Sequence, residues 1–251
     1  MKANNNENDK HFETERIINL EGTSAECLLL AKKTNKLLAG CDNLNIYSFL
    51  SPGYDILDIT WFSDKGDNPR DVIRRLIPNR KCRVLDLCCG TFSNGIQIAK
   101  NNPRNFIVGI DRSPEMLRKA KSKVRKDNLK NCRFRCCDAS ETGIKDSSFD
   151  YIILGLVLHE CNDRQWKDIL SEAGRLLKKN GRLIVLEWDE QRKTDRKIKF
   201  APLYAAEAML NPGFFREFYH SDKRKFFRKY GFEITDSYEC NYSSVLVMEK
   251  H

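Results

Sequence analysis

The stretch Val84-Leu85-Asp86-Leu87-Cys88-Cys89-Gly90-Thr91 contains the pattern that decides the fold. A short apolar run that carries one acidic residue passes directly into a loop of small side chains. This arrangement is typical of a strand that is buried on both faces of a parallel sheet and followed by a helix. In open α/β sheets, ligands lie outside the carboxyl ends of such strands. The stretch therefore predicts a strand that leads into a ligand-binding loop.

Further strand-like runs alternate with helix signals along the chain. Ser113 followed by Pro114 predicts a capped helix start, and an apolar stripe over 164–179 predicts a second helix that Asn180-Gly181 ends. The predicted strands are Arg83–Cys88, Asn105–Asp111, Cys132–Cys137, Phe149–Gly155, Arg182–Trp188, Phe232–Tyr238 and Tyr242–Met248. The last two are separated by a short polar turn and predict a hairpin. The alternation favours a doubly wound α/β sheet.

Residues 1–80 show a different pattern and are predicted to be mostly helical. Thr23 and Glu26 form a capping box, Gly40 marks a helix end, and Asn68-Pro69 starts a short helix. Residues 1–10 are polar and rich in Asn, so we expect a disordered start without a secretion signal and a cytoplasmic protein. The domain prediction is an N-terminal helical segment over 1–80 and a main domain over 81–251.

Composition limits the classes of protein that fit. No apolar run approaches the roughly 18 residues of a membrane span. The ten cysteines include no CxxC pair, so they are expected to be reduced thiols rather than a disulfide framework or a metal site. The net charge is +9, and residues 190–230 hold 11 Lys and Arg against 5 Asp and Glu. That basic segment suits an anionic substrate, a membrane surface or RNA, or simply solvated helix faces.

The loop after the first strand decides between two classes of α/β site. Cys88-Cys89-Gly90-Thr91-Phe92-Ser93 lacks two of the three glycines of G-x-G-x-x-G, which disfavours a dinucleotide site. The stretch instead resembles motif I of class I methyltransferases that use S-adenosylmethionine (SAM). Later segments resemble this family's motifs in order, over about residues 45–190: Gly109-Ile110-Asp111, Cys137-Asp138-Ala139, Phe149-Asp150-Tyr151 through Leu158-His159-Glu160, and Leu177 to Trp188.

The resemblance implies a Rossmann-like, mostly parallel seven-stranded sheet that ends in an antiparallel hairpin, with SAM as the cofactor. In the family, the carboxylate matching Asp111 accepts the ribose hydroxyls, and that matching Asp138 meets the adenine amino group. Tyr47 to Asp55 resembles a segment of ubiquinone- and menaquinone-type enzymes that closes over the cofactor, so residues 1–80 are expected to pack there. The cofactor-binding residues implied are Tyr54, Asp86, Cys88, Gly90, Asp111, Arg112, Met116, Asp138, Ala139 and Leu154.

The expected reaction is methyl transfer to a small-molecule acceptor of aromatic or lipid-like type. His159 is the nearest candidate for a general base by motif position. No metal is expected, because neither a His/Cys ligand cluster nor the acidic residue that metal-dependent catechol enzymes carry after this strand is present. Residues 190–220 are predicted to be an irregular lid over the acceptor, followed by a helix capped by Ser221, because they gather six Phe and Tyr residues within 20 positions.

Two alternatives stay open beside this prediction. One is a nucleic-acid methyltransferase, which the basic segment favours and the absence of an RNA-binding module disfavours. The other is a non-catalytic partner protein with the SAM fold. The sequence leaves the acceptor, the oligomeric state and the role of the cysteines undetermined.

Overall fold

The computed structural model describes residues 68–190, 194–210 and 213–251. Within them lies one seven-stranded sheet with the order β3-β2-β1-β4-β5-β7-β6. Strands β1 to β5 are parallel, while β7 is antiparallel to both β5 and β6, so the predicted closing hairpin is confirmed. The strands are β1 (Arg83–Leu87), β2 (Phe106–Asp111), β3 (Cys132–Cys136), β4 (Phe149–Gly155), β5 (Leu177–Trp188), β6 (Phe232–Glu239) and β7 (Ser243–Lys250).

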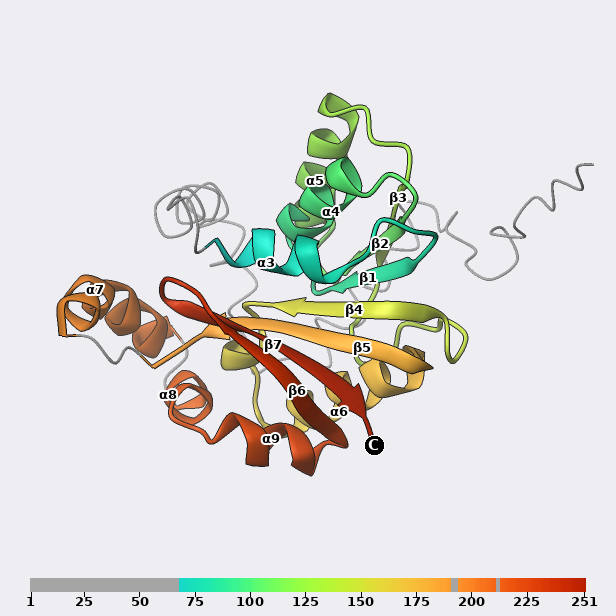
Figure 1. Cartoon of the computed structure of the whole chain (residues 1–251). Helices are drawn as coiled ribbons and strands as arrows, with labels where there is room; N and C mark the ends of the chain where they lie inside the picture. Colours follow the sequence, from blue (N-terminus) through green and yellow to red (C-terminus); the bar gives the residue numbers. More distant parts are fainter. Residues whose placement is uncertain (1–67, 191–193, 211–212) are drawn as a thin grey trace, which may run out of the picture.

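Helices cover both faces of this sheet, as Figure 1 shows. One face carries α3 (Pro69–Leu76), α4 (Ser93–Asn101) and α5 (Pro114–Lys126) over a buried apolar layer. The other carries α6 (Asp163–Leu176), α8 (Phe214–Tyr219) and α9 (Lys223–Lys229), with the short 3-10 helix η1 (Leu158–Glu160) after β4. The predicted Rossmann-like architecture is therefore confirmed.

The strand order reverses between β1 and β4, which lie side by side near the middle of the sheet. The chain runs outward from β1 through β2 to β3 and then returns to lay β4 on the opposite side of β1. Strand order reverses at this point, and open α/β sheets bind ligands there because the loops on either side diverge. Asp86, near the end of β1, and η1, which follows β4, both lie at this edge of the sheet.

Local signals predicted several helix starts correctly. The Asn68 side chain caps α3 and the Ser113 side chain caps α5, each with Pro at the next position. The final helix is different, because Asp222 caps α9 and the hydroxyl of Ser221 instead donates to the carbonyl of Phe218. The predicted cap at Ser221 was wrong, since an adjacent carboxylate takes the position.

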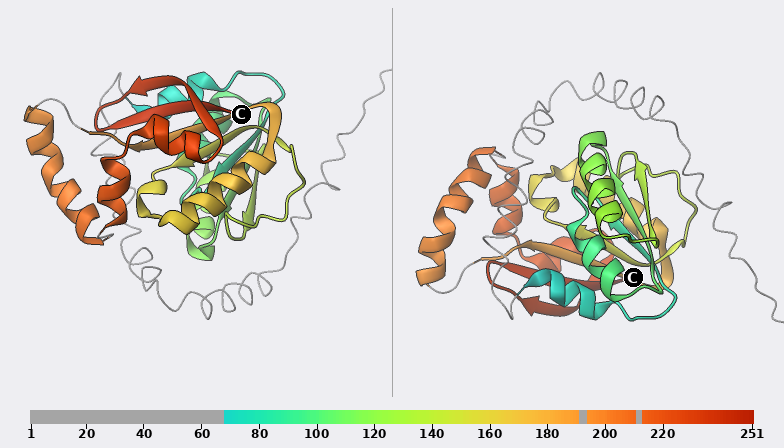
Figure 2. Two further views of the ribbon diagram at one scale, coloured as in Figure 1. Left: turned by 90° about the horizontal axis from the view of Figure 1, so that it is seen from below. Right: turned by 90° about the horizontal axis from the view of Figure 1, so that it is seen from above.

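Two predicted boundaries also differ from the structure. Helix α6 ends at Leu176, and β5 already begins at Leu177, where it pairs with Phe149 of β4. The segment over 190–220 is not irregular, because it contains α7 (Thr194–Leu210) and α8. Figure 2 shows both helices together at one end of the molecule.

Several predictions concern residues outside the described ranges. They are the capping box of Thr23 and Glu26, the helix end at Gly40, the cofactor contact of Tyr54 and the packing of residues 1–67. Eight cysteines lie inside the described ranges, and all eight are free thiols. Among the helices that the structure describes, none is long and apolar enough to cross a membrane.

Candidate functional site

The loop after β1 is fixed by two buried carboxylates. Asp86 is 1% exposed and accepts a hydrogen bond from the N–H of Gly95 in the first turn of α4, at 3.1 Å. Asp111, at the end of β2, accepts from the N–H of Gly90 at 2.8 Å and from that of Ser113 at 2.8 Å. These bonds connect the ends of β1 and β2 to the loop, so the sequence-predicted residues Asp86, Gly90 and Asp111 lie together.

Burial changes the acidity of both carboxylates. Loss of water around Asp86 raises its pKa to about 7, against the opposing effect of the hydrogen bond from Gly95. Burial likewise raises the pKa of Asp111, although the N–H groups of Ser113 and Gly90 favour its charged form. Carboxylates with raised pKa values at the carboxyl ends of strands are characteristic of functional sites, because stability alone does not favour burying them.

The loop leaves open space where a ligand can approach the backbone. Gly90 has a φ of +50°, and a Cβ atom built there would meet no atom of the described residues within 4 Å. Cys88 also has a positive φ, +59°, and burial raises the pKa of its thiol well above the usual value, so the thiol is neutral. The backbone at Gly90 is thus open to a ligand, while the side chains of Cys89, Thr91 and Phe92 are buried.

Phe92, in the same loop, is turned into the core. Its side chain is fully buried, and its ring packs edge-on against Phe134 at a centroid distance of 4.7 Å. The ring also lies over Gly95 and Gly109, where an added Cβ would come within 3 Å of it. Phe92 therefore fills the core beneath α4, and two glycines make the room that it needs.

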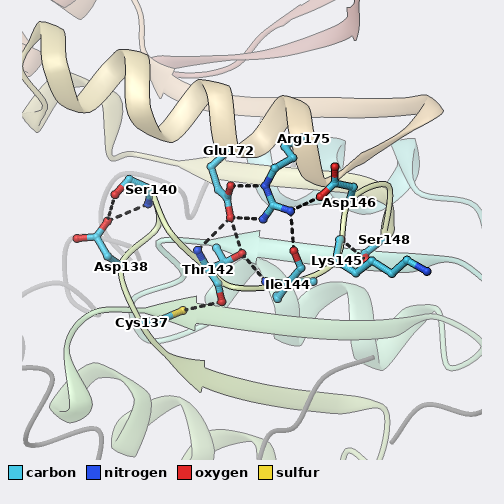
Figure 3. Close-up of polar contacts among 10 residues, drawn as sticks. All are labelled: Cys137, Asp138, Ser140, Thr142, Ile144, Lys145, Asp146, Ser148, Glu172 and Arg175. Carbon is cyan, nitrogen blue, oxygen red and sulfur yellow. Dashed lines mark hydrogen bonds and ion pairs between the residues drawn. The ribbon is translucent and has the colours of Figure 1, made fainter. Parts of the chain in front are cut away.

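Asp138 and Ala139 follow β3 at the same edge of the sheet. One oxygen of Asp138 accepts hydrogen bonds from both the N–H and the hydroxyl of Ser140, at 2.8 and 2.6 Å. Figure 3 shows how the following loop is tied to α6. The buried carboxylate of Glu172 accepts from the N–H and hydroxyl of Thr142 and from the guanidinium of Arg175. This network holds the loop on which Asp138 lies.

The remaining predicted cofactor contacts lie at different depths. Arg112 is exposed beside Asp111, and Met116 is half-buried in the first turn of α5. Leu154 has no exposed surface and belongs to the core under β4. The structure therefore brings the polar members of the predicted set to one edge of the sheet, while Leu154 contributes to the floor beneath them.

These residues fit the cofactor that the sequence predicts. A carboxylate has about four lone-pair positions, and the backbone uses two of them on Asp111, which leaves positions for the two hydroxyls of a ribose. The free space over Gly90 gives a ligand access to the loop. The acceptor positions of Asp111 are complementary to the ribose of a nucleoside such as SAM.

His159, the predicted catalytic residue, lies in η1 and is 2% exposed. Its Nδ1 is 2.6 Å from the carboxylate of Glu187, near the end of β5. Glu187 is 1% exposed, and its other oxygen accepts from the N–H groups of Val157 and Leu158, at 2.9 and 2.7 Å. The indole N–H of Trp166 donates to the carbonyl of Leu158 at 2.7 Å. The imidazole ring is therefore fixed on several sides.

Two further carboxylates face the other ring nitrogen of His159. Nε2 lies 3.6 Å from Glu207 of α7 and 3.9 Å from Glu160. Burial lowers the pKa of His159, but Glu187 and Glu207 outweigh that effect and raise it well above the usual value. In this state the ring donates protons rather than accepting one, and the role of His159 as a general base stays a prediction.

No motif in the sequence identified Glu187 as a site residue. It is an acidic residue near the end of a strand in which the preceding Leu183, Ile184, Val185 and Leu186 are all buried. An acid in such a position has to be paired when buried. A buried acidic residue near a strand end could therefore have been flagged from the sequence, but only the fold shows that its partner is His159.

Aromatic side chains of α7 and α8 line the region beside His159. The ring of Phe215 meets the imidazole edge-on at 5.7 Å and stacks on Tyr219 at 5.5 Å. The ring of Phe200 packs against those of Trp188 and Tyr242 and extends this aromatic cluster. Phe215 has no exposed surface, whereas Phe214 is 40% exposed. The aromatic residues predicted for the lid therefore divide into buried ones and an outward-facing one.

Comparisons with known proteins agree with this geometry. The chain is 28% identical over 144 residues to a demethylmenaquinone methyltransferase from Listeria welshimeri, in an alignment that covers 57% of this chain and 60% of that protein. The chain thus spans less than two thirds of the length of that curated relative. The structure is similar to a SAM-dependent methyltransferase from Aquifex aeolicus, with a TM-score of 0.56, 18% identity and coverage of 80% and 96%. It is also similar to the mitomycin 7-O-methyltransferase MmcR, with a TM-score of 0.65, 16% identity and coverage of 90% and 67%.

The family follows from the match to a family model. The matching region begins at Pro78, just after α3, and runs through the strand-end carboxylates and His159 into α9. Residues 78–225, more than half of the 251, match the family model described as a methyltransferase domain, and the chain therefore belongs to this family of class I, SAM-dependent methyltransferases.

Proposed function

We propose that this protein transfers a methyl group from SAM to a small-molecule acceptor of aromatic or lipid-like type. The observation that carries the proposal is that the imidazole of His159, held in place by a hydrogen bond, lies beside a cluster of aromatic side chains. His159 is held by Glu187 at one end, and Phe215 packs against its ring. An acceptor with a flat apolar body and one polar end is complementary to such a site.

The position of this site relative to the cofactor residues supports the proposal. β4 pairs directly with β1, and Leu154 lies opposite Leu87, so η1 begins one strand away from the loop of Gly90. SAM, when bound, supplies an electrophilic methyl group. The protein's task is then to hold the acceptor atom in line with that methyl group, at a near-attack distance of roughly 3–3.5 Å.

The two helices over 194–219 are proposed to act as the lid. Tyr204 of α7 contacts both Phe215 and Tyr219 of α8 through its ring, so the helices close over one another at the carboxyl edge. Loops and insertions at this edge form the binding surfaces of α/β proteins. Aromatic walls would exclude water from the reacting atoms. Phe214, exposed on α8, is the residue placed to meet an acceptor or solvent.

The names of similar proteins support the class of acceptor. The Listeria relative is named for demethylmenaquinone and the structural neighbour for the 7-oxygen of mitomycin, and both are small molecules. We carry over only this class, because the chain matches 60% of the relative's length.

The test follows the methyl group into a product. The full chain is incubated with methyl-labelled SAM and a cell extract, and the products are divided into solvent-extractable, acid-precipitable and nuclease-sensitive fractions. The proposal expects label in the solvent-extractable fraction, and expects Asp111→Ala to abolish it. Label that is acid-precipitable and released by nuclease would instead establish nucleic-acid methylation. No labelled product together with tight SAM binding would establish the non-catalytic alternative.

A further inference from the structure

We infer that His159, Glu160 and Glu207 form a binding site for a divalent transition-metal cation, with Glu187 orienting the histidine from outside the site. The three ligand atoms, one imidazole nitrogen and two carboxylate oxygens, lie within 4.8 Å of one another. They come from η1 and α7, two elements that the sequence separates and the fold brings together.

The spacing of the ligand atoms matches an ion placed between them. Nε2 of His159 lies 3.6 Å from Glu207 and 3.9 Å from Glu160, which is longer than an ordinary N–H···O hydrogen bond. Two ligands that each bind one ion at about 2.0–2.2 Å are separated by roughly 3.0–3.5 Å in tetrahedral or octahedral geometry. Shifts of about half an ångström would complete the coordination.

Glu187 supplies an independent observation that points to a metal. Histidines that bind metals almost always donate their other ring N–H to a carboxylate or a carbonyl, which fixes the tautomer and aims the ligand nitrogen. His159 does this through Nδ1, at 2.6 Å from Glu187. Binding of an ion at Nε2 releases the proton that this nitrogen carries in the metal-free protein. Glu187 is itself held by two backbone N–H groups, so the ring cannot turn away.

The surroundings also favour a cation. The His159 side chain is 2% exposed, and those of Glu160 and Glu207 are 21% and 13% exposed. With Glu187, three carboxylates converge on one imidazole, and clustered carboxylates away from water are costly unless a cation compensates them. Imidazole favours Zn²⁺ and Fe²⁺ while carboxylates favour Mn²⁺, so the mixed set suits a transition metal better than Ca²⁺ or Mg²⁺.

Three protein ligands leave coordination positions open for another molecule. Metals bound in this way polarise an oxygen ligand or lower the pKa of a hydroxyl. If the proposed function holds, the oxygen of an acceptor held in this way would be activated for methyl transfer. This last step rests on the proposed function, whereas metal binding itself does not. This proposal differs from the metal-free reaction that the sequence predicts, and the metal titration decides between them.

The experiment measures metal binding without any acceptor. Tag-free full chain is stripped with a chelator, dialysed, and titrated with Zn²⁺ or Mn²⁺ by calorimetry, and Co²⁺ is added separately to record visible absorption. We expect one ion per chain and a Co²⁺ spectrum of nitrogen and oxygen ligands. Glu207→Gln and Glu160→Gln should each weaken binding at least tenfold, and Glu187→Gln should weaken it by about 10–100-fold, the range for outer partners of a ligand.

Glu217→Gln is the matched control, because Glu217 lies on α8, within the proposed lid, but is exposed and outside the cluster. It should bind the metal as the unmodified chain does. Circular dichroism and SAM affinity are measured for every variant, so that loss of fold and failure of the proposed function are distinguished from loss of the metal site. Absence of binding at millimolar metal, or binding that Glu207→Gln and Glu160→Gln leave unchanged in folded protein, would overturn the inference.

Discussion

Asp86→Asn is expected to stabilise the protein while weakening its hold on SAM. The carboxylate is 1% exposed, and its oxygen accepts the N–H of Gly95 at 3.1 Å. An asparagine carbonyl at the same position accepts the same hydrogen bond with nearly the same shape. The substitution therefore removes a buried ionisable group without creating a cavity or an unsatisfied donor at Gly95.

The magnitude follows from the pKa of Asp86. Burial raises it from 3.8 to about 7, so between these values the folded protein keeps a proton that the unfolded chain has released. The stability of the unmodified protein consequently falls as pH rises from about 4 to about 7, and the whole cost is present above that range. At about 1.36 kcal/mol per unit of pKa, the cost is at most ~4 kcal/mol. Asn has no such cost, so its advantage is near zero at pH 4 and largest above pH 7.

The assay is urea unfolding of the cofactor-free protein at pH 5, 6, 7 and 8, followed by circular dichroism. The free energy of unfolding of Asp86→Asn should exceed that of the parent by an amount that increases with pH. Asp71→Asn on the surface of α3 is the matched control and should stay within about 0.5 kcal/mol at every pH. A difference that does not change with pH, or a variant less stable than its parent at pH 8, would refute the reasoning.

Further predictions concern the ribose-binding carboxylate, the buried network around Glu172 and the aromatic residues of the lid. Asp111→Ala should lower SAM affinity more than tenfold in calorimetry while circular dichroism stays unchanged, because each charge-assisted hydrogen bond is worth about 1.5–3 kcal/mol; an unchanged dissociation constant would contradict the assignment. Glu172→Ala leaves both buried donors of Thr142 without their acceptor, so urea unfolding should show a loss of roughly 2–5 kcal/mol; a loss below 1 kcal/mol would show that water or another group replaces the carboxylate. Phe215→Ala should cost about 3–5 kcal/mol of stability, whereas Phe214→Ala should keep stability and SAM affinity and raise the KM for the acceptor; equal thermal midpoints for the two variants would refute this division of the lid.

The sequence by itself determined the seven strands, their order along the chain and several helix starts. Apolar runs that suit burial on both faces identified all seven strands, and side chains that cap their own helix, such as Asn68 and Ser113, identified helix starts. It also placed Asp86, Gly90 and Asp111 correctly at one edge of the sheet. The strands and the helix caps can be predicted because they depend on residues close together in the chain. The shared edge can be predicted because parallel strands end at the same edge of a sheet.

Two local sequence patterns predicted a helix cap and a helix end at the wrong residues. Ser221 and Asp222 are both good caps, and the structure uses Asp222 because the hydroxyl of Ser221 bonds to the end of α8. Asn180-Gly181 resembles a helix end, yet it lies inside β5, because pairing with β4 begins at Leu177. In each case a contact with another element decided the outcome.

Only the tertiary structure decided what surrounds His159. Glu187 and Glu207 are distant from it in sequence, and each has the local pattern of its own strand or helix. Phe92 is similar, since its inward direction depends on the space that Gly95 and Gly109 leave. Side-chain partners across elements are set by packing, and packing depends on the whole fold rather than on a local period. The sequence therefore predicts which edge of the sheet carries the candidate site, and only the fold shows which charged side chains lie together there.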